Sequence, residues 1–145
     1  MQKSGFPWGF AVGIVVAAIF AVIISLIPGG VFTDPVGYVV LLVVVFVAGP
    51  PTVWLLRAIA ANRGVDPVSM VVGGMSGALL FDGLALSYIP GLYGQTGEAL
   101  TAVATMLLVA FAAIGISAHF MGALKAADAC RARALPTRDL TLDQT

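Results

Sequence analysis

Long runs of apolar residues, separated by short polar turns, dominate the chain. Each of four such runs is predicted to form a membrane-spanning helix, because about 20 apolar residues are enough to cross a bilayer. The expected spans are 8–27, 36–56, 68–89 and 99–124. Asp82 is the one Asp, Glu, Lys or Arg inside them. We therefore predict an all-α integral membrane four-helix bundle, with a transmembrane domain over 1–124 and a cytoplasmic tail over 125–145.

Composition supports this pattern and excludes most soluble classes. The chain is 60% hydrophobic and 10% charged, whereas about 25% charged residues is usual in soluble domains. Its formal net charge is zero, which gives no reason to expect nucleic acid as a partner. Cys130 is the one cysteine, so an intramolecular disulfide and a cysteine-rich metal site are excluded. Because no Walker loop, HExxH motif or serine-hydrolase motif with its partners occurs, we expect no enzymatic activity and no metal site.

Two kinds of repeated signal organise the turns. Asp34-Pro35 and Asp66-Pro67 are predicted to start the second and third spans, since aspartate favours the N-cap and proline the first helical position. The segments 25–29 and 87–91 share Ser, Ile, Pro and Gly, and each follows the first helix of a pair. This similarity suggests two helical hairpins in tandem.

Small residues mark the faces along which helices are expected to approach closely. Gly9 and Gly13, followed by Ala17 and Ala21, recur at a spacing of four and so share one face of the first span. The third span carries five small residues in the segment 73–78. We expect this third helix to be central in the bundle.

Pro50 and Pro51 lie inside the second span. They lack the backbone N–H groups that would bond the carbonyls of Phe46 and Val47, so a kink or a short unwound stretch is predicted. The break serves either helix packing or a binding site at a broken helix.

Asp82 is the residue whose position most needs an explanation, because an ionised carboxylate inside a bilayer costs about 2.5–3.5 kcal/mol. Depth along the fourth span places Thr105 opposite it, with Thr101 one turn above. One hypothesis is a structural hydrogen bond between Asp82 and Thr105. Another is a proton or cation site facing a cavity, and a third is pairing with a basic residue of another subunit.

His119 is the second polar candidate, nearer the opposite face of the membrane. We expect it to hydrogen-bond to a neighbouring helix, with Arg57, Thr52 and the carbonyls freed by Pro50 and Pro51 near its depth. Axial ligation of a haem or a chlorophyll-type pigment is the alternative, although two-histidine ligation within one chain is excluded. The sequence therefore leaves the cofactor unknown.

Basic residues predict how the chain is threaded. If four spans are drawn, all seven fall on one side: Lys3, Arg57, Arg63, Lys125, Arg131, Arg133 and Arg138. The positive-inside rule then places both termini in the cytoplasm. On this threading Tyr38, Tyr88 and Tyr93 are expected in an aromatic belt at the outer interface.

The block Gly77-Ala78-Leu79-Leu80-Phe81-Asp82, followed by Ile89-Pro90-Gly91-Leu92-Tyr93, resembles a family of small bacterial four-span inner-membrane proteins of unknown function. The resemblance covers residues 32–121. It implies a multi-pass protein of a bacterial inner membrane and carries no activity.

These observations favour an accessory or structural membrane protein, a subunit of a larger membrane assembly or a self-associating one, with the lipid bilayer as its surroundings. The alternative is a small proton- or cation-coupled transporter that acts as an oligomer and uses Asp82. The environment of Asp82 separates the two hypotheses.

Overall fold

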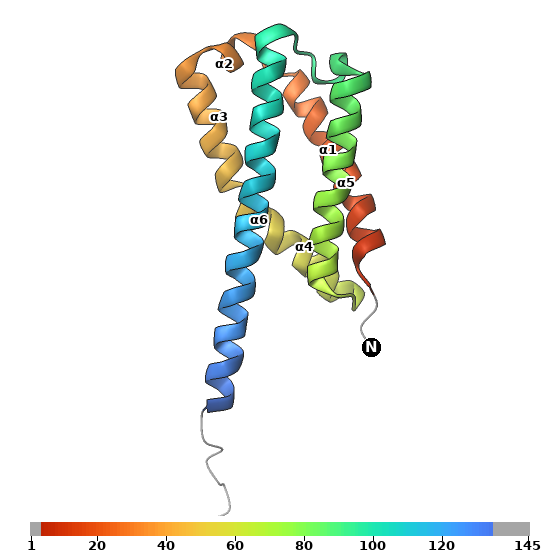
Figure 1. Cartoon of the computed structure of the whole chain (residues 1–145), viewed down its shortest axis with the longest axis vertical. Helices are drawn as coiled ribbons and strands as arrows, with labels where there is room; N and C mark the ends of the chain where they lie inside the picture. Colours follow the sequence, from red (N-terminus) through yellow and green to blue (C-terminus); the bar gives the residue numbers. More distant parts are fainter. Residues whose placement is uncertain (1–3, 135–145) are drawn as a thin grey trace, which may run out of the picture.

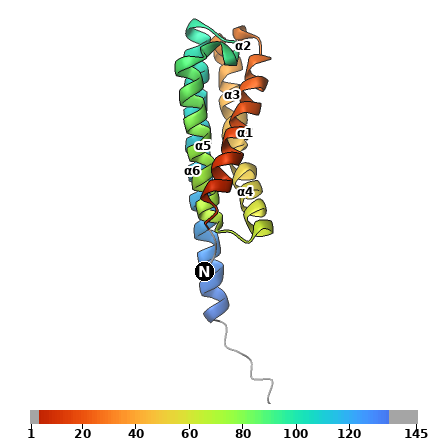
Figure 2. The same ribbon diagram turned by 90° about the vertical axis from the view of Figure 1, so that its right-hand side faces the viewer.

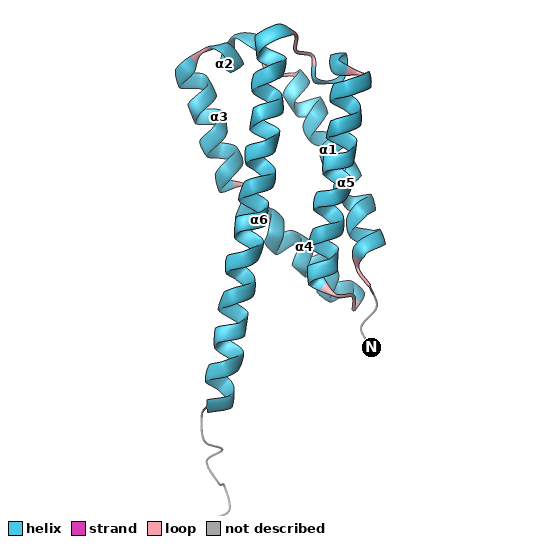
Figure 3. Cartoon of the chain, viewed as in Figure 1, coloured by secondary structure: helices cyan, strands magenta, loops and turns pink. Residues whose placement is uncertain are grey.

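The computed structural model describes the backbone of residues 4–134 and the side chains of residues 4–122. Throughout this part the chain is helical, with short connecting turns and no strand (Figure 3). Four helical segments are long and apolar enough to cross a membrane: Phe6–Ser25, Pro35–Arg63, Pro67–Tyr88 and Gly97–Gly122. The predicted all-α bundle is therefore confirmed, and the chain is a multi-pass membrane protein.

Aspartate caps and prolines define where the helices begin. The described elements are α1 (Phe6–Ser25), α2 (Gly29–Thr33), α3 (Pro35–Val47), α4 (Gly49–Arg63), α5 (Pro67–Tyr88), the 3-10 helix η1 (Pro90–Tyr93) and α6 (Gly97–Ala134). The carboxylate of Asp34 accepts a hydrogen bond of 2.7 Å from the amide of Gly37, and that of Asp66 accepts one of 2.7 Å from Ser69. Both predicted caps are thus confirmed.

The closest helix pair is α1 and α5, which lie side by side along most of their length (Figures 1 and 2). Glycines make this approach possible, because a Cβ added at Gly9 or Gly13 would collide with the carbonyl oxygen of Met70 or Gly74. In the same way, a Cβ at Gly73 or Gly77 would collide with a backbone carbonyl of α1. The predicted small-residue faces therefore bring the backbones of α1 and α5 into direct contact.

The second span is broken at Ala48, as the two prolines predict. Helix α3 ends at Val47, and α4 begins at Gly49 with Pro50 and Pro51 in its first turn, where missing N–H groups cost least. Figure 1 shows α4 leaving the line of α3 and passing behind α6 toward the lower end of α5. The break lets α4 pack against both α5 and α6, whereas α3 packs mainly against α6.

Buried side chains form two clusters stacked along the bundle. The first lies at the end that holds α2 and η1, here called the turn end, and includes Ile24, Phe32, Tyr93 and Val103. The second lies toward the end that holds the N-terminus, here called the N-terminal end. Its buried members are Val53, Leu56, Ala60, Val65, Met70 and Val71. The break between α3 and α4 falls between these clusters.

The two similar segments that follow the first and third spans, 25–29 and 87–91, both lie at the turn end. The side-chain amide of Gln95, just after η1, donates to the carbonyls of Ile27 at 2.8 Å and Ile24 at 3.5 Å, at the exit of α1. The two predicted hairpins do not form two separately packed pairs, because the closest contact joins their first helices, α1 and α5, and α1 does not pack substantially against α3.

Candidate functional site

Asp82 lies on the inner face of α5 and is only 5% exposed. Its Oδ1 accepts a hydrogen bond of 2.7 Å from the hydroxyl of Tyr93, a side chain with no exposed surface. The carboxylate is therefore held by a residue 11 positions further along the same chain.

The turn after α5 brings Tyr93 back over Asp82. Pro90 begins η1, which ends at Tyr93, and Gly94 then turns the chain with a positive φ of 65°. Gly94 also lies against α1, since a Cβ there would meet the carbonyl oxygen of Ser25 at 3.0 Å. Together with the bonds of Gln95 to α1, this contact fixes η1 on the bundle and directs the Tyr93 ring inward.

The environment of Tyr93 keeps it a hydrogen-bond donor. Burial, reinforced by the hydrogen bond to Asp82, raises the pKa of the Tyr93 hydroxyl above its ordinary value. Because the raised pKa is far from neutral pH, the phenol stays protonated and can donate to the carboxylate.

Asp82 also borders a cavity of about 220 Å³ at the level of the break between α3 and α4. The lining comes from α1, α3, α4, α5 and α6 and is apolar apart from Asp82 and Thr52. The hydroxyl of Thr52 donates to the carbonyl of Ala48 at 2.7 Å, within its own helix. Asp82 is therefore the one ionisable group among the residues that line this cavity.

The expected pairing of Asp82 with Thr105 is wrong. The Thr105 hydroxyl donates to the carbonyl of Thr101 at 3.1 Å, and that of Thr101 donates to Gly97 at 3.4 Å. Both threonines are exposed on α6, whose buried face carries Val103 and Met106 instead. The position of Thr105 along the fourth span predicts its depth in the membrane. It does not predict the direction in which the side chain points around the helix axis.

Among the described residues, the other candidates form no hydrogen bond with Asp82, whose side-chain partner is Tyr93. His119 lies on an exposed part of α6 with its ring edge toward Phe120, at 5.9 Å between centroids. Pro50 and Pro51 are exposed, whereas their neighbours Gly49 and Thr52 line the cavity. Among the described residues, His119 forms no hydrogen bond to a neighbouring helix, so that expectation is not met.

Arg57, expected near His119, is half-buried and lines a second cavity between α4, α5 and α6. Cys130 lies on α6 outside the described side chains. Within the described residues no three His, Cys, Asp or Glu side chains are grouped so that they could hold a metal ion.

Sequence reasoning missed Tyr93 as a partner of Asp82, because it placed that tyrosine in the outer aromatic belt. Tyr88 does fit such a belt, being 80% exposed, whereas Tyr93 is fully buried. The available signal was the Pro-Gly turn between the two tyrosines, which reverses the chain toward α5. Comparisons with known protein families, curated proteins and solved structures found no match to this chain.

Proposed function

We propose that this chain is an accessory or structural protein of a bacterial inner membrane, acting as a subunit of a larger membrane assembly. The observation that carries the proposal is the buried hydrogen bond from Tyr93 to Asp82. A carboxylate used in coupled transport has to exchange protons or cations with water, whereas a structural one needs only a satisfied partner. With 5% exposure and a donor from its own chain, Asp82 fits the structural role.

The packing of the helices also supports a scaffold. Backbone contact between α1 and α5 and the clamped η1 turn give a rigid unit. By contrast, α3 has no buried residue, so its apolar surface is available to lipid and to partner subunits.

The second candidate is a proton- or cation-coupled transporter. The observation that favours it is the position of Asp82 beside an intramembrane cavity at a broken helix, because substrate and ion sites in transporters are often built at such breaks. In this alternative the bond to Tyr93 would open and close during turnover.

Cross-linking in native membranes tests the scaffold proposal. A cysteine at Val43 on α3 and a matched cysteine at Ile19 on α1 have similar exposure, 57% and 55%. We expect the Val43 variant to cross-link to a stoichiometric membrane partner and the Ile19 variant to cross-link only weakly. The partner should also co-purify with Asp82→Asn, since asparagine still offers an acceptor to Tyr93. A wild-type chain that is monomeric in mildly solubilised membranes, with no cross-linked partner at either site, would contradict the proposal.

A further inference from the structure

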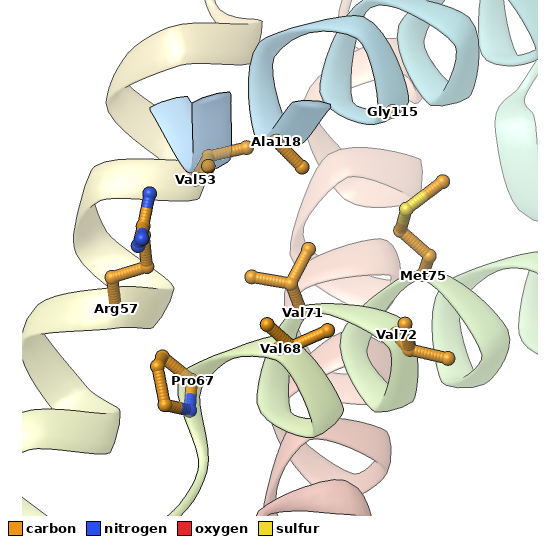
Figure 4. Close-up of a pocket in the computed structure, with 10 residues that line it drawn as sticks. Val53, Arg57, Pro67, Val68, Val71, Val72, Met75, Gly115 and Ala118 are labelled. Atoms are coloured by element: carbon orange, nitrogen blue, oxygen red, sulfur yellow. The ribbon is translucent and has the colours of Figure 1, made fainter. Parts of the chain in front are cut away.

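A groove of about 250 Å³ opens between α5 and α6, with α4 at its side (Figure 4). It begins at Pro67, the first residue of α5, with Gly122 of α6 also in its lining, and continues inward to Met75 and Gly115. Eight residues of α helix correspond to about 12 Å, so the groove runs from the membrane boundary for about two turns. It is distinct from the cavity beside Asp82, which shares none of its lining residues.

The α6 side of the groove is lined by small residues, and on the α5 side it is lined by valines that are partly exposed. Gly115, Ala118 and Gly122 present no bulk toward α5. On the facing side Val68 and Val72 are 66% and 49% exposed, so the groove is accessible from the side rather than sealed in the bundle. Its accessible apolar lining suits a flexible hydrocarbon chain.

Among the described residues that line the groove, Arg57 is the one charged group, and none of them is acidic. Figure 4 shows its side chain projecting from α4 beside Val53, across the space from Val68 and Val71 of α5. It is half-buried, and a guanidinium in a membrane protein needs an anionic or hydrated partner. A planar guanidinium binds phosphate, like carboxylate, through two parallel hydrogen bonds. In a bilayer, phospholipid headgroups supply the phosphate.

We propose that this groove binds one anionic phospholipid, with an acyl chain against Val68, Val72 and Gly115 and the phosphate on Arg57. Charge complementarity favours a lipid with a net negative charge, because a zwitterionic headgroup brings its own cation to compete with Arg57. The position of the groove supports a lipid occupant, since it starts at the membrane boundary and opens sideways to the bilayer. Basic pockets between spans are known to recognise anionic headgroups in this way.

Native mass spectrometry of the full chain, with phosphatidylglycerol and phosphatidylcholine of identical acyl chains, tests the proposal. The wild type should retain phosphatidylglycerol with an apparent affinity about tenfold or more above that for phosphatidylcholine. Arg57→Gln should remove this preference. Gly115→Leu should weaken both lipids by filling the groove, and a Cβ at Gly115 meets only Met75, at 3.7 Å, so the fold should tolerate it.

Two matched variants control for general effects. Arg63→Gln removes a basic residue whose guanidinium lies 4.4 Å over the Trp8 ring, outside the groove. Gly83→Leu adds the same side chain as Gly115→Leu at a site with nothing within 4 Å. Both should keep the wild-type lipid preference. Equal retention of the two lipids by the wild type, or an unchanged preference in Arg57→Gln, would overturn the proposal. Loss of a protein partner rather than a lipid from Arg57→Gln would instead assign Arg57 to a subunit interface and would also overturn it.

Discussion

At the scale of single residues, the hydrogen bond between Tyr93 and Asp82 holds the turn after α5 on the bundle. The sequence identified Asp82 from its charge inside an apolar span, which needs no structure. It could not identify Tyr93, because the direction of a side chain after a Pro-Gly turn depends on how Gln95 and Gly94 dock on α1. Thr105 was misplaced for a related reason, since the rotation of α6 is set by packing rather than by length.

Removing the hydroxyl of Tyr93 tests this bond. Tyr93→Phe leaves the Asp82 carboxylate buried without its donor, so we expect a loss of about 1–3 kcal/mol in the free energy of unfolding. Asp82→Asn keeps an acceptor for Tyr93 and should cost less than Tyr93→Phe. Thermal and denaturant unfolding in detergent measure both. An unfolding free energy of Tyr93→Phe equal to that of the wild type would show that the bond is not structural.

Asp66 gives a pH dependence at the start of α5. Hydrogen bonds from the backbone and side chain of Ser69 lower the pKa of Asp66 below its ordinary value. When the pKa of a carboxyl group is lower in the folded state than in the unfolded state, the group stabilises the fold. This contribution is complete at pH values above the unfolded pKa, which is about 4. That contribution is lost as the pH falls through the folded value.

We therefore expect hydrogen exchange at the Ser69 amide to accelerate, relative to the intrinsic rate, when the pH is lowered below about 4. Asp66→Asn keeps a capping oxygen but has no proton to bind, so its protection should not change over the same range. Equal pH dependence in the two proteins would assign the effect to another group.

At the scale of helices, the apolar runs and aspartate caps predicted the four spans, and the prolines predicted a kink or an unwound stretch in the second span. The short helices α2 and η1 were not predicted. The spacing of Gly9 and Gly13 predicted a close contact but not its partner. Only the folded chain shows that the partner is α5, because four-residue spacings of small residues also occur elsewhere in this glycine-rich sequence. The further course of α4 toward α5 likewise depends on packing against two other helices.

Adding one methyl group to the contact between α1 and α5 tests it. Gly13→Ala places a Cβ against the carbonyl of Gly74, and overpacking of this kind costs about 1–3 kcal/mol. Gly83→Ala is the matched control, since nothing lies within 4 Å of the added atom, and it should be neutral or slightly stabilising. Unfolding in detergent compares the two. A similar stability for both variants would mean that α1 and α5 are not interlocked.

Spin labels on the second span test the break. A straight helix from Val40 to Ala61 would be about 32 Å long, and the break at Ala48 should give a shorter distance between labels at these exposed sites. Replacing both Pro50 and Pro51 by alanine restores two N–H donors and should lengthen this distance. A wild-type distance that already matches the straight helix would contradict the break.

At the scale of the whole molecule, the N-terminal end and the turn end lie at opposite ends of the bundle, and each has its own polar contact. Arg63 and Trp8 meet at the N-terminal end, whereas Gln95 and Ile27 meet at the turn end. The distribution of basic residues predicts that the N-terminal end faces the cytoplasm.

Cysteine labelling in intact cells tests this orientation. Gly30 and Thr96 are exposed at the turn end, so cysteines there should react with an impermeant thiol reagent. A cysteine at Asn62, exposed at the N-terminal end, should react only after the cells are opened. Gln95 is unsuitable as a labelling site because its side chain is buried and bonds α1. Labelling of Asn62→Cys in intact cells would show that the N-terminal end faces outward, which contradicts the proposed orientation.

The central claim is that the one intramembrane carboxylate of the described spans is structural. Proton flux in proteoliposomes, measured with an internal pH indicator for the wild type and Asp82→Asn over a panel of cations and small amines, tests it most directly. The structural role predicts the same background flux for both proteins under every condition. Substrate-dependent proton flux in the wild type that Asp82→Asn abolishes, while folding is retained, would contradict the scaffold and establish the transporter in its place.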